Sequence, residues 1–271
     1  MKHWTLDDIP WERFDRSKVD PEILCVIKAA AMVEHNGTEY GIYLRNVFAR
    51  DSEFNKATET WADEEVQHGQ ALGRWAMMAD PEFDFDAAFA RFRDGYKLPL
   101  DATTSVRGSL AGELMARCIV ETGTSSYYTA LRDITEEPVL KEICARIAAD
   151  ELRHYKLFYS HMRRYVQSER LGVWGRLRIG LARIFESEDD ELAYAYYAAN
   201  GGDAAYNRRD NTRAHALRAY RVYRQDHLYR AVAMVFKAVG LKPHGLLNGW
   251  LTTAIWGFVR WRVRRLERVA T

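Results

Sequence analysis

The sequence contains two Glu-x-x-His motifs, Glu65 with His68 and Glu151 with His154. On a helix, residues at positions i and i+3 lie on the same face, so the carboxylate and imidazole of each motif can bind one metal ion. One such motif arises easily by chance. Two motifs with matched glutamates upstream are a far more specific indication of metal chemistry.

The matched glutamates, Glu34 and Glu121, begin two segments that align without a gap and place Tyr40 and Tyr127 at equivalent positions. Each glutamate precedes its motif by about 30 residues, and turn-like sequence lies midway between them. Each half therefore reads as a helical hairpin. Tyr40 and Tyr127 are expected either to line a shared pocket or to belong to the core.

Two hairpins packed side by side bring four carboxylates and two imidazoles to one level of a four-helix bundle. This is the ligand set of di-metal carboxylate centres, with a Glu from two helices and Glu-x-x-His from the other two. The alternative is that each glutamate is a solvated surface residue. Burial of four unpaired carboxylates would cost several kcal/mol each, which favours bound metal.

The elements that position these residues are predicted to be helical, and the fold class is all-α. The predicted bundle helices span residues 21–48, 53–79, 104–134 and 138–169. Residues 81–103 are the crossover connection and contain a short amphipathic helix. Asn36-Gly37 interrupts the first helix, either as a distortion beside a ligand or as a point of weakened helix.

The chain is thus divided into a lead-in at 1–20, a bundle at 21–170 and a helical extension at 171–271. The extension is expected to contain an arginine-bearing helix, an acidic run, a break and a long helix. These expectations fall on residues 171–185, 186–191, 200–203 and 204–239.

The last predicted helix, residues 246–269, is rich in tryptophan and then basic. Residues 242–271 contain six Lys or Arg and one acidic residue. The apolar part is too short to span a bilayer. The helix is expected to lie in a membrane interface, to dock an acidic carrier protein, or to cap the bundle and bury its tryptophans.

Composition excludes several classes of protein. The 271 residues are 48% hydrophobic and 28% charged, and a net charge of +1 gives no nucleic-acid footprint. Cys25, Cys118 and Cys144 are isolated in apolar segments, which predicts reduced thiols. The polar N-terminus does not resemble a signal peptide. These features predict a cytoplasmic protein, with contact at the inner membrane face as an alternative.

The paired motifs resemble the ferritin-like superfamily of non-haem di-iron proteins. Within it, Trp61-Ala-Asp-Glu-Glu-Val-Gln-His-Gly69 and Ala149-Asp-Glu-Leu-Arg-His154 are similar to motifs of the soluble acyl-carrier-protein desaturases, and so is Glu121-Thr-Gly-Thr124. The resemblance covers roughly residues 23–165. The chain is shorter than those desaturases, its first Glu-to-Glu spacing is shorter, and the basic tail has no matching counterpart.

The resemblance implies two iron ions, with Fe/Mn or Mn/Mn as alternatives. Glu34 and Glu121 would bridge or bind terminally, and each Glu-x-x-His pair would complete one iron; whether Glu39 replaces or assists Glu34 stays open. Thr124 would lie beside the oxygen site or bond to its own helix. Asp150 is expected to hold His68, and repeat symmetry adds Glu64 to His154.

The function implied is an O₂-activating oxidoreductase that attacks a C–H bond of an apolar, acyl- or lipid-like substrate. A reductase or ferredoxin would supply electrons, an acidic carrier protein is one way to present the substrate, and the chain would form a homodimer. The alternatives are a ferritin-like peroxidase or iron-handling protein, and a non-catalytic metal-stabilised bundle that binds a membrane or partner through its tail.

Overall fold

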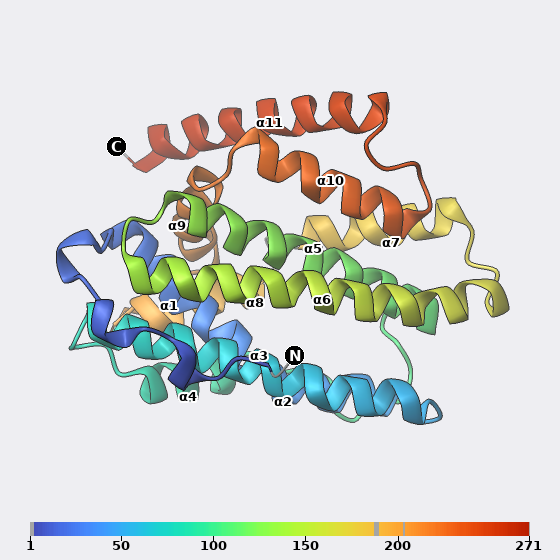
Figure 1. Ribbon diagram of the computed structural model, residues 1–271, viewed down its shortest axis with the longest axis horizontal. Helices are drawn as coiled ribbons and strands as arrows, with labels where there is room; N and C mark the ends of the chain where they lie inside the picture. The colour runs from blue at the N-terminus through green and yellow to red at the C-terminus, as the bar shows by residue number, and fades with distance from the viewer. Residues whose placement is uncertain (1–2, 187–189, 203, 271) are drawn as a thin grey trace.

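A computed structural model describes residues 3–186, 190–202 and 204–270, and these residues form helices and turns with no β-strand among them (Figure 1). The predicted all-α class is confirmed. Parts of the expected acidic run and of the expected break at 200–203 lie outside the described residues.

The first two predicted bundle helices begin close to their expected residues, and side chains cap their starts. Three short 3₁₀ turns lead into α1 (Pro21–His35), where the Asp20 carboxylate accepts hydrogen bonds from the first-turn amides. The helix breaks at Asn36 and resumes as α2 (Gly37–Val47), so the predicted interruption is present. Helix α3 (Ser52–Ala79) begins where the Asp51 side chain accepts from the Phe54 amide.

Helix α4 (Phe85–Gly95) lies within the connection, as predicted. Helix α5 (Leu110–Ile134) begins later than the expected residue 104, because the Ser109 hydroxyl caps it at the Gly112 amide. Gly108 precedes this cap with a φ of 79°, a left-handed conformation that a helix cannot include. Helix α6 spans Pro138–Ser168, close to its predicted bounds.

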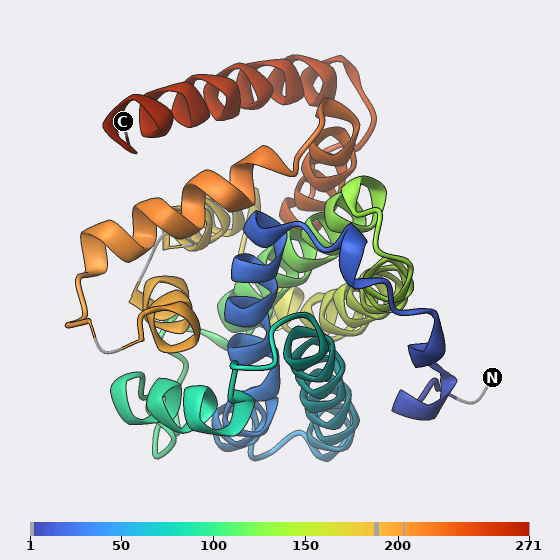
Figure 2. The same ribbon diagram turned by 90° about the vertical axis from the view of Figure 1, so that its left-hand side faces the viewer.

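Four helical stretches surround one interior. Helices α5 and α6 pack along their lengths, α1 and α2 both pack on α3, and α3 contacts α6 (Figures 1 and 2). The core around them is apolar and includes fully buried Trp75, Leu72 and Phe158. This arrangement turns one face of each stretch toward the same interior.

The extension consists of α7 (Val173–Phe185), α8 (Asp190–Asn200), α9 (Arg208–Arg221), α10 (Gln225–Val239) and α11 (Leu246–Ala270). The single helix expected over 204–239 is wrong, because the chain breaks between α9 and α10. At this break the buried His227 ring accepts the Arg224 amide and contacts Asp133 of α5 at 3.0 Å. Helices α7 and α10 pack on α5, and α8 packs on α1.

The last helix, α11, lies along the outside of the molecule and packs against α10 and α9 (Figures 1 and 2). Trp250 and Trp261 are exposed there, so the expectation that this helix buries its tryptophans is wrong for these two. Within the described residues, every helix is too short or too polar to cross a membrane.

Candidate metal centre

The six side chains predicted as metal ligands converge between α1, α3, α5 and α6. Each is less than a tenth exposed: Glu34 5%, Glu65 9%, His68 0%, Glu121 1%, Glu151 1% and His154 1%. The carboxylate and imidazole within each motif share a helix face because they are three residues apart. Glu34 and Glu121 reach the same level from α1 and α5.

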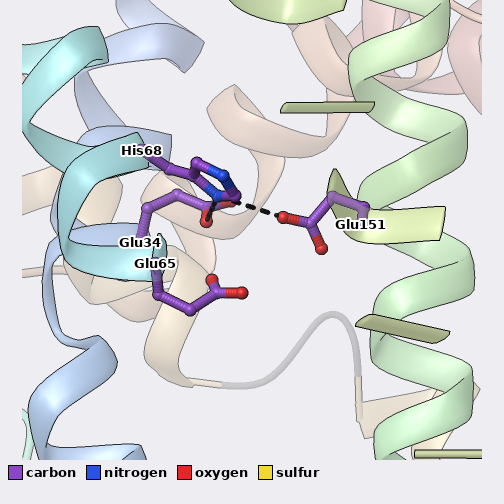
Figure 3. A group of neighbouring side chains, drawn as sticks. All are labelled: Glu34, Glu65, His68 and Glu151. Atoms are coloured by element: carbon purple, nitrogen blue, oxygen red, sulfur yellow. Dashed lines mark ion pairs between the residues drawn. The ribbon is translucent and has the colours of Figure 1, made fainter. Parts of the chain in front are cut away.

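The six side chains form two groups, and within each group one ligand atom per residue lies within 4.8 Å of the others. One group contains Glu34, Glu65, His68 and Glu151, and the second contains Glu65, Glu121, Glu151 and His154. Glu65 and Glu151 belong to both groups. Figure 3 shows Glu151 facing the other three members of the first group from the opposite helix.

The expectation left Glu34 and Glu121 as either bridging or terminal ligands, and each of them belongs to one group only. The motif glutamates stand at the centre because they lie on α3 and α6, which face each other across the site. His68 Nδ1 is 3.3 Å from Glu151 Oε1 and 3.5 Å from Glu34 Oε2 (Figure 3). His154 Nδ1 is 3.0 Å from Glu65 Oε1 and 3.8 Å from Glu121 Oε2.

The outer nitrogen of each imidazole contacts a carboxylate of the opposite motif. His68 Nε2 lies 3.1 Å from Asp150 Oδ2, and His154 Nε2 lies 2.7 Å from Glu64 Oε2. Both contacts are those expected from the motif and the repeat. Arg153 joins the two carboxylates, donating to Glu64 at 2.8 Å and to Asp150 at 2.5 Å. Each Nε2 thus donates a proton outward, which leaves Nδ1 free to bind metal.

The N-terminal lead-in covers one side of the site, and the sequence analysis missed this. Trp4 Nε1 donates to Asp150 Oδ2 at 2.6 Å, and its ring stacks on His68 with centroids 5.9 Å apart. His3 Nε2 lies 2.9 Å from the same oxygen. The contacts join residues about 150 positions apart in a segment without periodicity, so no local pattern indicated them.

Two hydroxyl groups on α5 orient ligand carboxylates. Thr124 Oγ1 donates to Glu151 Oε2 at 2.6 Å, and Tyr128 donates to Glu34 Oε1 at 2.6 Å. Thr124 thus contacts a ligand of the opposite helix as well as its own backbone. Tyr128 was not predicted, although it lies seven residues after Glu121 and therefore on the same helix face.

Three further residues singled out in the sequence, Tyr40, Tyr127 and Glu39, do not belong to either ligand group. Tyr40 and Tyr127 both have buried hydroxyl groups without a hydrogen-bond partner among the described residues. Tyr127 packs between Tyr128 and Tyr223, while Arg117 lies over the Tyr40 ring. Glu39 accepts two hydrogen bonds from Arg93 instead of joining the site, so it does not replace Glu34.

Burial and mutual repulsion perturb the acids and bases of the metal-free site. Burial and the nearby carboxylates of Glu151 and Glu34 raise the pKa of Glu65. Burial and Glu151 likewise raise the pKa of Glu121. Burial alone would lower the pKa values of His68 and His154, but the surrounding carboxylates raise both.

The pKa of Glu151 is shifted in the opposite direction, to lower values. Burial opposes its ionisation, yet the neighbouring imidazoles of His154 and His68 hold the pKa of Glu151 well below the usual value. The pKa of Asp150 is also lowered, because hydrogen bonds from His68 and Trp4 outweigh its burial. The metal-free site therefore keeps protons on some carboxylates and on its imidazoles, whereas metal ions would take their place.

The residues fit a pair of metal ions. Buried ligand atoms without a hydrogen-bond partner among the described residues face the interior: Glu34 Oε2, Glu65 Oε1, His68 Nδ1, Glu151 Oε1 and His154 Nδ1. Buried polar atoms are normally satisfied, so such a cluster requires a partner. Carboxylate and imidazole donors without thiolate suit divalent iron, manganese or zinc.

A scan against protein-family models and a search of curated proteins gave no match to this chain.

Proposed function

We propose that this chain is a ferritin-like di-iron protein that activates O₂ and oxidises a C–H bond of an apolar, acyl- or lipid-like substrate. The observation that carries the proposal is the pair of buried four-ligand groups that share Glu65 and Glu151. Glu65 and Glu151 would each be available to two ions, whereas a single structural metal needs only one group.

Two iron ions, when bound, would supply the electrons that reduce O₂ and the oxidising power that attacks a C–H bond. Glu34 and Glu121 would each bind one ion, and the imidazoles would complete the two ligand groups. Tyr128 fixes the Glu34 carboxylate, and Thr124 fixes Glu151, so the carboxylates keep their places when the charge of the centre changes.

The chain also shapes the surroundings of the centre. Trp4 stacks on His68, and Trp61 lies edge-on to His154 with centroids 6.4 Å apart, so aromatic rings cover both imidazoles. Such walls exclude water and favour an apolar substrate. Electrons are proposed to come from a separate reductase or ferredoxin.

The first experiment measures metal content and the absorption of bound ferric iron after anaerobic loading with Fe(II). Wild type is expected to hold about two ions per chain, because it has two ligand groups. Glu151→Ala removes a ligand from both groups and is expected to hold less than about one ion. Glu121→Ala removes a ligand from one group and should retain about one ion.

Glu39→Ala is the control, since Glu39 is an acidic residue of α2 that pairs with Arg93 away from the site. It should load like wild type. A wild-type chain that holds no iron would overturn the proposal. The enzymatic part is tested with reductant, O₂ and a panel of acyl chains, using mass spectrometry to detect oxidised products. Oxidation and storage of many iron equivalents without any organic product would instead support iron handling.

A further inference from the structure

The N-terminal half of helix α11 buries polar residues and exposes large apolar ones, while Val259 and Leu266 are buried farther along the helix. Asn248 and Thr252 are buried, with 0% and 1% of their surfaces exposed, whereas Trp250 is 81% and Leu246 is 89% exposed. Asn248 Nδ2 donates to the Tyr229 carbonyl and Thr252 donates to the Asn248 carbonyl, whereas the buried Asn248 Oδ1 has no hydrogen-bond partner among the described residues. Buried polar residues and exposed large apolar residues are the informative exceptions to normal burial.

The outward apolar side chains recur at helical spacing and form a row along the helix. They are Leu247 (61% exposed), Trp250 (81%), Leu251 (39%), Phe258 (54%) and Trp261 (50%). These side chains are exposed although α9 and α10 pack against α11, which lies on the outside of the molecule (Figure 2). A contiguous apolar row of this kind on an outer helix marks an interaction surface.

The C-terminal half of α11 adds positive charge to this surface. It has five arginines and one acidic residue, Glu267, which already pairs with Arg221 of α9. Arg260, Arg264 and Arg265 are exposed and have no carboxylate partner among the described residues. Most arginines of the bundle have a carboxylate partner; Arg45, for example, pairs with Glu59.

A hollow beside α11 concentrates further arginines. Its volume is about 500 Å³, and it is lined by Arg208, Arg209, Thr212, Arg213 and Arg262. Asp190 lies 3.6 Å from Arg208, and Asp210 lies 4.0 Å from Arg213. The side of the molecule formed by α9 and α11 therefore presents cations next to aromatic side chains.

We propose that the outward face of α11 docks on an anionic lipid surface. Tryptophan and leucine enter the boundary between headgroups and acyl chains, while arginines remain at the level of the phosphates. Each cation near an anionic membrane adds to the attraction. A second copy of the chain fits less well, because pairing through this face would bury arginines without bringing any carboxylate to them.

This inference concerns a surface remote from the metal ligands, and its test does not depend on metal. The full chain is mixed with vesicles of phosphatidylcholine alone, or of phosphatidylcholine with phosphatidylglycerol, and flotation is measured. Wild type is expected to float with the anionic vesicles only. Trp250→Ser and the double variant Arg264→Glu/Arg265→Glu should each lower the partition coefficient about tenfold or more.

Matched controls separate the α11 face from general stickiness. Trp174→Ser removes an equally exposed tryptophan of α7, and Lys156→Glu/Arg163→Glu makes the same charge change on exposed positions of α6. Both should float like wild type, and circular dichroism should show all variants folded. The proposal is overturned by absence of flotation, by equal flotation on neutral vesicles, or by equal losses in the controls. Self-association that Trp250→Ser abolishes, without flotation, would assign the face to a second copy instead.

Discussion

Tyr128 and Tyr127 are adjacent on α5 but differ in their relation to the metal centre. Tyr128 donates to Glu34 Oε1 at 2.6 Å, whereas the Tyr127 hydroxyl is buried without a hydrogen-bond partner among the described residues. Burial raises the pKa of both phenols, so both stay protonated. Only the Tyr128 hydroxyl can orient a ligand.

We therefore expect Tyr128→Phe to weaken metal binding about 10-fold to 100-fold, because groups that hold ligands typically contribute this much. Tyr127→Phe is the matched control and should leave the affinity unchanged. Competition with a chelator of known affinity measures both. Equal losses in the two variants would show that the hydroxyl of Tyr128 does not position Glu34.

Residue types and spacing predicted which six side chains converge, but not that Glu65 and Glu151 would belong to both groups. The internal repeat was enough to identify Glu34 and Glu121, and helix periodicity fixed the faces of the two motifs. The central placement of Glu65 and Glu151 depends on side-chain rotamers and on the distance between α3 and α6, which spacing along the chain does not determine. The contact of Trp4 with Asp150 could not be predicted either, because Trp4 lies in a segment without periodicity.

At the scale of the elements, the junction of α1 and α2 is pressed against α3. A Cβ added at Gly37 would lie 2.5 Å from Glu65 Cβ and 2.8 Å from the Ala62 carbonyl oxygen. The contacts involve backbone and a ligand residue, so the side chains cannot simply turn aside. A glycine is required here to bring the broken helix close to the metal ligands.

Gly37→Ala is expected to destabilise the protein by about 1–3 kcal/mol, as overpacking typically does. It should also reduce metal content by shifting Glu65. Gly123→Ala provides the contrast, because a Cβ at this exposed position of α5 meets nothing within 4 Å. That variant should gain about 0.5–1 kcal/mol from better helix propensity. Denaturant unfolding measures both, and a neutral Gly37→Ala would contradict the close approach.

Helix boundaries were predictable where a cap or proline fixed them and not elsewhere. The predicted starts at residues 21 and 53 agree to within one residue with the observed starts at Pro21 and Ser52, where the Asp20 and Asp51 side chains cap the helices. The break between α9 and α10 has no proline or glycine, and it depends on the tertiary contact between His227 and Asp133. A prediction from helix propensity alone therefore merged α9 and α10 into one helix.

At the scale of the whole molecule, the metal-free site makes stability depend on pH. Burial and neighbouring carboxylates raise the pKa values of Glu65 and Glu121, and carboxylates raise those of His68 and His154. Above pH 6.5 the folded state therefore binds more protons at these groups than the unfolded state. Stability is then lost as the pH rises through the folded-state values.

The free energy of unfolding of metal-free protein should fall between pH 6.5 and 8.5. The slope is about 1.4 kcal/mol per pH unit for each proton held only by the folded state. The lowered pKa values of Glu151 and Asp150 act below this range and do not reverse the sign. The extra stability that bound metal gives should instead increase with pH, because metal binding releases protons. Thermal unfolding with chelator or with metal, at both pH values, measures the difference.

The two candidate ligand groups also constrain when the protein could acquire metal ions during synthesis. The N-terminal hairpin supplies Glu34, Glu65 and His68, but both groups require Glu151 from the second hairpin. A nascent chain that has exposed only its first hundred residues thus has no complete ligand group. Metal capture would therefore wait until the second hairpin has left the ribosome and docked, and the half-made protein would not hold a reactive ion in an open site.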